Sequence, residues 1–403
     1  MLKILVVTPV FWPESFRIND LVQAWVEQGH EVEILTGTPN YPHASQFPNH
    51  SWCRPLNEMA FGARIMRAPV FPRGRARAIE LGLHYLSFVV MGSLRLLLHR
   101  GNDWDRIFVF QTSPVTVVLP AFLARMWCRA PVVMWVQDLW PEAVTSSGMV
   151  RNQAIGMILK LFSSNIYRGC NRLVTQSKAF LEILVARGVP ASRIAYVPNW
   201  AEDFYLSGVN GSEVGYMPGQ PFTVLFAGNL GRGQGAETIL QAMLLLKSHP
   251  LIRWRLVGEG ALKPWLQAQV ADLGLGSQVE FIPACPPEAM PPLFAKADAL
   301  LVCLRKDPVY TMTVPGKLQS YMASGRPVLG CIDGEGAGII RESGAGLVAP
   351  AEDAEALAAQ VCSLMELGYA TRAAMGTRGR AWFLEHYLRS VCIAQLEEEL
   401  AKA

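Results

Sequence analysis

The chain has 403 residues, of which 51% are hydrophobic and 17% are charged, and its formal net charge is +3. This length is too great for one ordinary hydrophobic core and predicts two domains of about 200 residues each. No run of 18 uncharged apolar residues is present, so the sequence contains no clear membrane span. A buried-strand pattern begins at Leu2, and we expect no signal peptide.

Charge is distributed unevenly between the two halves. Residues 1–200 contain 20 Lys and Arg against 12 Asp and Glu, whereas the remainder contains 16 against 21. Five arginines lie close together with no acid among them: Arg64, Arg67, Arg73, Arg75 and Arg77. A basic first half favours an anionic membrane surface or an anionic acceptor as partner, and the alternative is a solvated basic loop. On the membrane hypothesis, replacing Arg73, Arg75 and Arg77 by serine should weaken sedimentation with anionic vesicles.

Eight cysteines are scattered along the chain, and none forms a C-x-x-C pair. Most of them lie in apolar strand or helix patterns. We therefore expect free, buried thiols in a reducing compartment and no zinc site.

Strand and helix patterns alternate along the chain, which predicts an α/β fold with parallel sheets. A first strand at 2–7 is followed by a helix from about Ser15 and a second strand at 31–36. No G-x-G-x-x-G follows the first strand, which disfavours a nicotinamide dinucleotide fold. The loop 37–42 lies at the carboxyl end of the second strand, where ligands of open α/β sheets gather.

The segment 78–100 is predicted to be a helix with apolar residues on more than one face. A helix this apolar is either fully buried or leans on a membrane. We favour the buried alternative.

Two carboxylates follow a buried strand at 131–136. Asp138 and Glu142 lie in a loop rich in Trp and Pro, after a strand at 106–110 and a helix at 115–127. Apolar surroundings raise the pKa of a carboxyl group, so both are candidate acid/base groups, Asp138 before Glu142. The structural alternative is that either one caps the helix that follows.

The first half closes with a strand at 172–177, in which Ser177 can cap the next helix, and an extended stretch at 194–199. The stretch 202–220 is rich in Gly, Ser, Asn and Asp and is interpreted as the linker.

The second half repeats the strand–turn–helix pattern. A strand at 222–228 enters a glycine-rich loop that contains Arg232, and the strands at 254–260 and 279–283 also end at Gly or Pro. Glycines let backbone N–H groups approach a phosphate closely. Because carboxyl ends of parallel strands share one edge of a sheet, we expect these turns to converge on the helix at 315–325.

That helix is predicted to start with Pro315 as its first residue and to end at Gly325. Its first turn offers free N–H groups and the charge of Lys317, which is typical of a phosphate site. The alternative is an ordinary capped helix. The chain is expected to end in a helix from about 372 to 403, with Glu397–Glu399 on a solvated face.

These features resemble the GT-B glycosyltransferases of the retaining GT4 type along nearly the whole chain. The matched places are Gly29–Val32, Val197–Asn199, Phe226–Gly235, Val257–Gly260, Ala297–Ala299 and Tyr321–Val328. Three further stretches resemble a bacterial subgroup that builds O-antigen or capsule and includes N-acetyl-L-fucosamine transferases: Phe11–Asp20, Asn40–Pro42 and Asp138–Glu142.

The chain departs from the family pattern at the donor site. The two glutamates that the family usually carries, with seven residues between them, correspond to Met312 and Ser320, and its usual Arg and Lys of the phosphate loop correspond to Asn229 and Gln234. We expect Arg232, Lys317 and the helix N-terminus to meet the diphosphate charge instead. The usual His before the interdomain Asp is Gln137.

The resemblance implies two Rossmann-like domains facing each other across a cleft. The expected N-terminal domain (1–203) binds the acceptor, the C-terminal domain (204–382) binds the nucleotide sugar, and a helix at about 383–403 crosses back to the first. The expected donor residues are Gly228, Asn229, Arg232, Gln234, Gly258, Glu259, Pro283, Thr313, Val314, Pro315, Gly316, Lys317 and Ser320. The expected acceptor residues are Glu14, Ser15, Arg17, Asn19 and Tyr41.

The expected reaction is retaining transfer of a sugar, N-acetyl-L-fucosamine or a related amino sugar, from a UDP-linked donor to a lipid-linked saccharide. We expect no metal and no cofactor, with Asp138 orienting or deprotonating the acceptor. The expected location is cytoplasmic, peripheral at the inner face of the cytoplasmic membrane, without nucleic acid as a partner. Two alternatives are a nucleotide-sugar 2-epimerase on the same fold and a non-catalytic sugar-nucleotide-binding protein.

Overall fold

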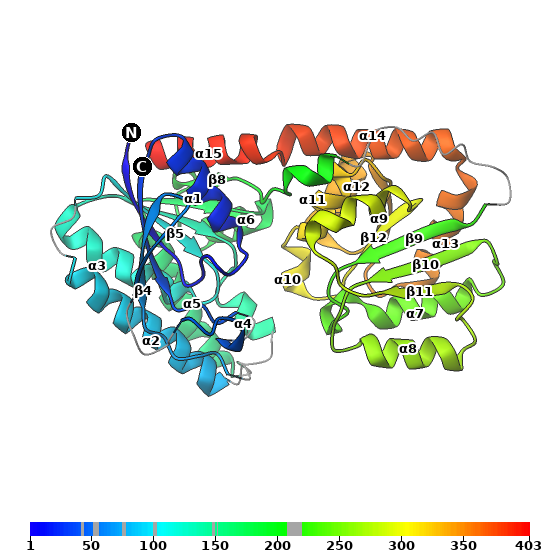
Figure 1. The fold of residues 1–403 in the computed structure, drawn as a ribbon, viewed down its shortest axis with the longest axis horizontal. Coiled ribbons are helices and arrows are strands. Elements are labelled where there is room, and N and C mark those ends of the chain that lie inside the picture. Colours follow the sequence, from blue (N-terminus) through cyan, green and yellow to red (C-terminus); the bar gives the residue numbers. More distant parts are fainter. Residues whose placement is uncertain are drawn as a thin grey trace. The chain divides into compact units, whose positions relative to one another are not determined.

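A computed structural model describes residues 1–41, 44–50, 56–74, 78–99, 103–146, 150, 152–207 and 220–403. Pro42, Cys53, Arg75, Arg77 and most of the expected linker lie outside these residues. The chain forms two compact units (Figure 1). The first comprises Met1–Val197 with Ile393–Ala403, and the second comprises Pro198–Cys392.

The first unit is built on an eight-stranded sheet of order β3-β4-β2-β1-β5-β6-β7-β8, parallel except for the pair β3–β4. Its strands are β1 (Lys3–Val7), β2 (Glu31–Gly37), β3 (Leu56–Ala60), β4 (Ala63–Ala68), β5 (Arg106–Gln111), β6 (Val132–Val136), β7 (Arg172–Thr175) and β8 (Ile194–Tyr196). Its helices are α1 (Arg17–Glu27), η1 (Ala44–Gln46), α2 (Ala78–Leu97), η2 (Val115–Val118), α3 (Leu119–Cys128), α4 (Glu142–Ser146), α5 (Gln153–Gly169), α6 (Lys178–Ala186) and η3 (Ala191–Arg193).

The second unit is built on a six-stranded, wholly parallel sheet of order β11-β10-β9-β12-β13-β14. Its strands are β9 (Phe222–Ala227), β10 (Ile252–Val257), β11 (Val279–Ile282), β12 (Ala299–Cys303), β13 (Val328–Cys331) and β14 (Gly346–Ala349). Its helices are η4 (Asp203–Leu206), η5 (Arg232–Gln234), α7 (Ala236–Leu245), α8 (Lys263–Asp272), η6 (Pro287–Ala289), α9 (Met290–Ala295), α10 (Pro308–Thr311), α11 (Gly316–Ala323), α12 (Gly334–Ser343), α13 (Ala354–Glu366) and α14 (Tyr369–His386). The last helix, α15 (Arg389–Ala401), falls mainly in the first unit.

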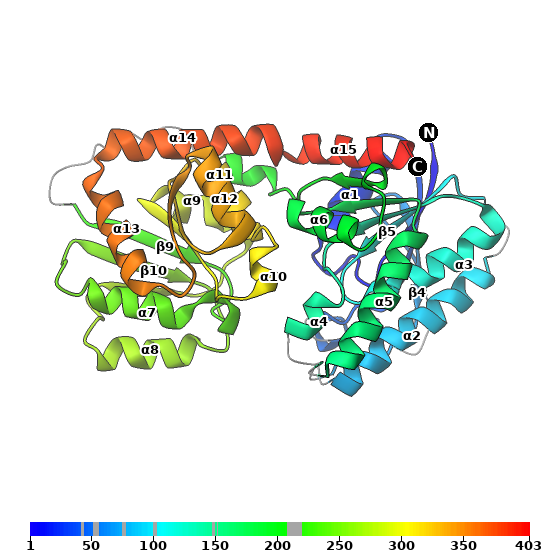
Figure 2. The same ribbon diagram turned by 180° about the vertical axis from the view of Figure 1, so that it is seen from behind.

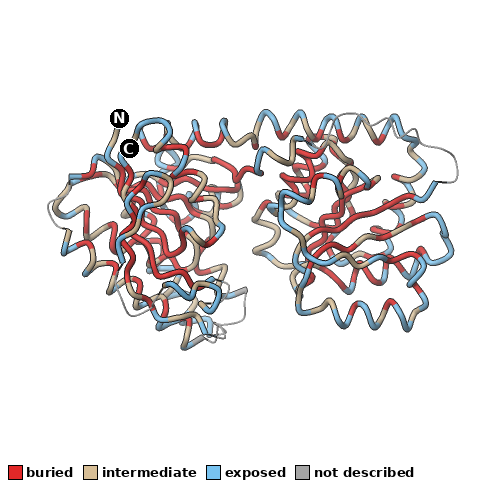
Figure 3. The backbone as a smooth tube through the Cα atoms, viewed as in Figure 1, coloured by how far each residue is buried: buried red, intermediate tan, exposed pale blue. Residues whose placement is uncertain are grey.

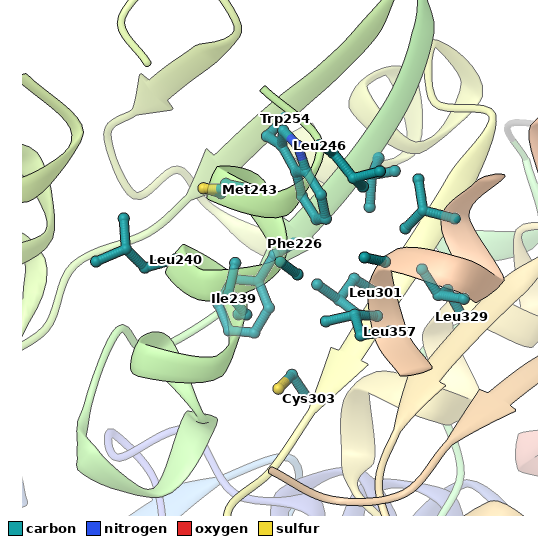
Figure 4. Packing of buried hydrophobic residues seen from close by; sticks show 14 of the residues in the cluster. Phe226, Ile239, Leu240, Met243, Leu246, Trp254, Leu301, Cys303, Leu329 and Leu357 are labelled. Carbon is teal, nitrogen blue, oxygen red and sulfur yellow. The ribbon is translucent and has the colours of Figure 1, made fainter. Parts of the chain in front are cut away.

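The predicted α/β class with parallel sheets is confirmed, and its physical basis is visible in β9. Side chains of a strand alternate between the two faces of a sheet. Phe222, Val224 and Phe226 enter one hydrophobic cluster, while Leu225 and Ala227 enter another on the opposite face. Figure 4 shows the first cluster, where Phe226 packs beside Ile239 of α7. Because both faces are covered, the central strands are continuously buried (Figure 3).

Arg64 and Arg67 do not belong to a solvated basic loop, since both lie in β4. Arg67 is fully buried and forms an ion pair with Glu58 at 2.5 Å, and Arg64 pairs with Glu33 at 3.3 Å. The alternative of a solvated loop is therefore wrong for these two residues. No sequence pattern indicated β3, whose Glu58 supplies one of these acids.

The stretch 202–220 was interpreted as a linker, but its first residues belong to the second unit. They form η4, in which the Tyr205 ring stacks on Phe294 with a centroid separation of 5.8 Å. Aromatic packing against the core, rather than chain flexibility, governs this segment.

The expected solvated face Glu397–Glu399 is wrong for Glu397 and Glu399, whereas Glu398 is exposed as expected. Glu399 is buried and ion-paired with Arg172, and Glu397 lies 3.1 Å from the Nε2 atom of His30. Burial raises the pKa of Glu399, but its bonds to Arg172 and Lys402 outweigh burial and leave that pKa lowered. These contacts hold Ile393–Ala403 within the first unit.

We expected α2 to be buried, and the structure contradicts this for one of its faces. Leu81, Phe88 and Leu96 are buried, whereas Ile79 and Leu86 are largely exposed. By length and composition alone, Ile79–Leu97 could cross a membrane, which the sequence analysis did not expect of any segment. Only 28% of that window is buried.

Candidate functional site

Helix α11 begins where the sequence predicted an anion-binding helix. Pro315 has φ −62° and ψ 128°, so it precedes the helix instead of being its first residue as we expected. Gly325 follows the helix with φ +67°, as predicted. The first two helical residues, Gly316 and Lys317, have no acceptor for their N–H groups inside the helix. An anion placed there would receive those hydrogen bonds.

Tyr321 fixes α11 against the end of β9, and the sequence analysis missed this role. Its hydroxyl group accepts a hydrogen bond from Ala227 N at 2.8 Å and lies 3.2 Å from Ala227 O as donor. The side chain is fully buried. The paired contacts hold the helix in register with the strand that carries the glycine-rich turn.

The glycine turns after β9 and β10 meet each other, as the convergence of parallel strand ends predicts. Gly228 has φ +138° and Gly258 has φ +141°, a region that side chains rarely adopt. A Cβ atom on Gly258 would lie 2.0 Å from Gly228 O, and one on Gly228 would lie 3.1 Å from the Nζ atom of Lys317. The two turns and Lys317 therefore share one confined space.

Lys317 carries the charge at this place. Its Nζ atom donates to Gln234 Oε1 at 2.6 Å and lies 3.8 Å from the centre of the Phe226 ring. Burial lowers the pKa of Lys317 to about 7, although the nearby Cys303 acts in the opposite direction. Within the described part of the chain, no carboxylate pairs with Lys317. A half-buried cation without a counter-anion is suited to receive an anionic group.

The other expected donor residues occupy the rim of the same region or the structure around it. Glu259 is paired with Lys263 at 2.7 Å, which lowers the pKa of Glu259, and Ser320 Oγ donates to Lys317 O at 3.0 Å. Arg232 and Pro283 are exposed, and Val314 is buried. Thr313 Oγ1 donates a hydrogen bond to Tyr310 O at 3.4 Å. Asn229 Oδ1 would lie 2.6 Å from a Cβ atom added to Gly260.

In the first unit, Glu14 organises the loop after β1. Its Oε1 atom accepts from Asn40 N at 2.9 Å and from Tyr41 N at 2.7 Å, and its Oε2 atom accepts from Phe11 N at 3.3 Å. Burial raises the pKa of Glu14, while these backbone donors and Arg67 lower it in part. Glu14 thus joins the loops that follow β1 and β2.

Asn19 has a similar local role, because its side chain donates to Glu14 O at 2.7 Å and accepts from Trp12 N at 3.0 Å. The buried Arg67 adds hydrogen bonds to Trp12 O and, at 3.1 Å, to Gly37 O. Sequence reasoning missed this role of Arg67, since only the fold brings β4 beside the loop.

The more accessible part of the first unit's site contains Tyr41. The Tyr41 ring is 46% exposed, and the guanidinium carbon of Arg73 lies 5.3 Å from its centre. The charge of Arg73 also affects the pKa of Tyr85 in α2. Burial raises that pKa, the positive charge of Arg73 lowers it in part, and the negative charge of Asp138 raises it. The structure therefore gathers Tyr41, Arg73, Tyr85 and Asp138 in one electrostatic neighbourhood. Ser15 is exposed and Arg17 partly exposed nearby in the chain.

Ser113 holds the Asp138 carboxylate through two hydrogen bonds. The Asp138 Oδ2 atom accepts from Ser113 N and from Ser113 Oγ, both at 2.9 Å, and Ser113 Oγ also accepts from Trp140 Nε1 at 3.2 Å. The sequence analysis did not single out Ser113, which lies after β5. These bonds fix the carboxylate and leave the Oδ1 atom for another partner.

Glu142 is differently placed. It is the first residue of α4 and forms an ion pair with the buried Arg187. Arg187 also donates to Trp140 O at 2.5 Å. The pairing fixes the Glu142 Oε1 atom, whereas its Oε2 atom is buried without a hydrogen-bond partner among the described residues, so the acid/base role of Glu142 stays a prediction.

Within the residues that the structure describes, no group of three or more His, Cys, Asp or Glu side chains is placed to hold a metal ion. The seven cysteines described there are free thiols, and four of them are buried.

Comparison with known proteins agrees with this geometry. The family described as Glycosyl transferases group 1 matches residues 221–367, and the family described as Glycosyl transferase 4-like domain matches residues 15–200. The chain is a glycosyltransferase of group 1 with the GT-B fold, and hence an enzyme.

Two relatives of known name are also glycosyltransferases. The chain is 27% identical over 339 residues to WcaI of Escherichia coli (strain K12), a protein named for glycosyl transfer in colanic acid biosynthesis, covering 80% of this chain and 82% of that protein. It is 26% identical over 318 residues to WbjE of Pseudomonas aeruginosa, named as a glycosyltransferase, covering 74% and 75%. These names favour a transferase over the epimerase and the binding protein.

Two solved structures show the same fold. Sucrose-phosphate synthase from Thermosynechococcus elongatus matches with a TM-score of 0.74 and 17% identity over 98% of both chains. Anabaena Alr3699/HepE in complex with UDP matches with a TM-score of 0.71 and 14% identity over the whole of both chains.

Proposed function

We propose that this chain transfers a sugar from a UDP-linked donor, bound by the second unit, to a lipid-linked saccharide bound by the first unit. The proposed pathway is O-antigen or capsular polysaccharide synthesis, and the proposed sugar is N-acetyl-L-fucosamine or a related amino sugar. The observation that carries the proposal is Lys317, a half-buried lysine at the N-terminus of α11 whose ammonium has no carboxylate partner among the described residues. The UDP complex of Anabaena Alr3699/HepE, which has the same fold, supports the choice of nucleotide.

The proposed donor chemistry follows from where charge develops. When the bond between the sugar and the diphosphate breaks, the leaving diphosphate gains negative charge. N–H groups of Gly316 and Lys317 and the Lys317 ammonium are fixed in advance, so they stabilise that charge without reorganising. Arg232 in η5 is exposed and able to add a second cation. In this proposal the reaction uses no metal and no cofactor, and the anomeric configuration is retained.

The proposed acceptor chemistry centres on Asp138. Ser113 fixes one carboxylate oxygen, and the other is available to orient the acceptor hydroxyl group or to take its proton. Arg73 and Tyr41 provide a cation and an aromatic face for the charged and sugar parts of a lipid-diphosphate saccharide. Such an acceptor places the enzyme in the cytoplasm at the inner face of the membrane.

A thermal-shift screen against UDP, GDP, ADP and dTDP tests the donor proposal. We expect UDP alone to raise the unfolding temperature, because a ligand at 100 times its Kd stabilises a protein by about 2.7 kcal/mol. The shift should disappear in Lys317→Ala and persist in Lys247→Ala, which changes an exposed lysine two residues beyond the end of α7.

A shift with a different nucleotide would replace UDP in the proposal, and no shift with any of the four would contradict donor binding at α11. The transfer step has its own test. UDP should be released only when a lipid-linked acceptor is added, whereas a 2-epimerase would act on the nucleotide sugar without acceptor.

A further inference from the structure

Helix α2 exposes a continuous apolar stripe along its whole length. Its members recur every three or four residues, so they lie on one face of the helix. They are Ile79, Leu83, Leu86, Val90, Leu94 and Leu97, each between 41% and 79% exposed. The opposite face packs against β2, β4 and α3 of the first unit.

Helix α5 extends this surface. Ten residues from Gln153 to Phe162 include no buried side chain, and five of them are exposed large hydrophobics: Ile155, Met157, Ile158, Leu161 and Phe162. Both helices contact η2, and the N-terminal ends of α2 and α5 lie next to each other in both views of the first unit (Figures 1 and 2). We call these eleven residues of the two helices the α2–α5 face.

The charges of these helices have one predominant sign. Arg95, Lys160 and Arg168 are the basic residues of α2 and α5, and Glu80 is the single acid in their sequences. Helix α3, which packs on α2, adds Arg125 and has no acid. Arg95 is turned toward β3, where its Nη2 atom donates to Asn57 Oδ1 at 2.5 Å, so the exposed cations of this surface are Lys160 and Arg168 of α5. An apolar surface that carries exposed cations matches the interface of an anionic bilayer, where acyl chains lie beneath negative headgroups.

We infer that the α2–α5 face inserts into the headgroup region of an anionic phospholipid bilayer and docks the first unit there. A bilayer explains the charges better than a second copy of the chain, because α5 presents the exposed Lys160 and Arg168 and contains no acid that a second copy could pair with them. Insertion parallel to the membrane plane also suits α2 better than spanning, since one face of α2 is packed on the sheet.

The same helix links the bilayer to the acceptor site. Arg73 lies five residues before the start of α2, and its guanidinium carbon is 5.3 Å from the centre of the Tyr41 ring. The stripe therefore begins close in the chain to residues of the proposed acceptor site; this last link alone rests on the proposed function.

Vesicle sedimentation of the full chain tests the inference. Wild-type protein should sediment with phosphatidylglycerol vesicles, and binding to phosphatidylcholine vesicles should be at least tenfold weaker. The variant Ile79→Gln/Leu86→Gln/Ile158→Gln/Leu161→Gln should lose at least tenfold in partition to the anionic vesicles. The matched control is Leu244→Gln/Leu245→Gln/Leu251→Gln, which changes exposed leucines of the second unit and should bind as wild type does.

Thermal unfolding and the nucleotide-induced shift should be the same for the fourfold variant and wild type, which separates lost docking from lost folding and from failure of the donor proposal. Unchanged sedimentation of the fourfold variant would overturn the inference, as would wild-type protein that binds neither kind of vesicle. Light scattering gives a further outcome: a wild-type dimer that the fourfold variant converts to monomer, without vesicle binding, would make the face an interface between copies.

Discussion

The acids of the first unit's candidate site and Lys317 of the second unit's candidate site differ in the kind of partner that the fold gives them. In the first unit, Glu14 accepts three backbone hydrogen bonds, Glu142 is paired with Arg187, and Asp138 is bonded twice by Ser113. In the second unit, Lys317 has a carboxamide oxygen and an aromatic ring as partners. These bonds hold the acids in place, whereas the ammonium of the half-buried Lys317 has no carboxylate partner among the described residues, and an anionic ligand would supply one.

The largest effect is expected from Asp138→Asn. Asparagine keeps an oxygen for the Ser113 N–H group but cannot take a proton, so kcat should fall by about 10²–10⁴-fold. The measurement is steady-state transfer to a lipid-linked acceptor. The nucleotide-induced thermal shift should stay at the wild-type value, and Glu182→Gln, at an exposed position of α6, should leave kcat unchanged. Wild-type kcat in Asp138→Asn would show that this acid has a structural role.

A smaller but still large effect is expected from Gly258→Ala. The added Cβ atom would lie 2.0 Å from Gly228 O, at a φ of +141°. We expect the free energy of unfolding to fall by about 2–4 kcal/mol and nucleotide binding to be lost, because the two turns that enclose the Lys317 ammonium must separate. Urea unfolding and the thermal shift measure the two effects.

The control for Gly258→Ala is Gly276→Ala, where the new Cβ atom meets nothing within 4 Å. Equal destabilisation by both substitutions would mean that the close approach of Gly258 to Gly228 does not determine the stability of the second unit.

The smallest effect is a pH dependence of stability that comes from Lys317. Its folded pKa of about 7 lies below the ordinary lysine pKa of 10.5, so between these values the unfolded chain binds one more proton than the folded chain. Stability of the ligand-free protein should therefore rise with pH in this window, by about 1.4 kcal/mol per pH unit, and Lys317→Met should lack this contribution.

Urea unfolding at pH 7, 8 and 9 measures that slope, with Lys247→Met as the control that should keep the wild-type slope. Identical slopes for wild type and Lys317→Met would show that the Phe226 ring and Gln234 keep the ammonium charged throughout, and the contrast with the first unit would disappear.

Prediction from sequence succeeded where the signal is local. Hydrophobic periodicity and backbone preferences predict the buried strands, the helix after Pro315, the left-handed Gly325 and the N-cap Ser177. The Ser177 side chain accepts a hydrogen bond from Phe180 N. It failed where a partner is distant along the chain. Glu399 looked solvated because Arg172, which neutralises it, is more than 200 residues away.

The sequence by itself determined the α/β class, the glycine turns and the position of Lys317 at a helix start, because each depends on residues within a few positions of one another. Only the tertiary structure decided that Ser113 fixes Asp138, that Arg67 is buried beside the loop after β1, and that one face of α2 is exposed while the other is buried. The physical reason is that burial and hydrogen-bond partners depend on which elements pack together, and packing joins residues that no local pattern connects.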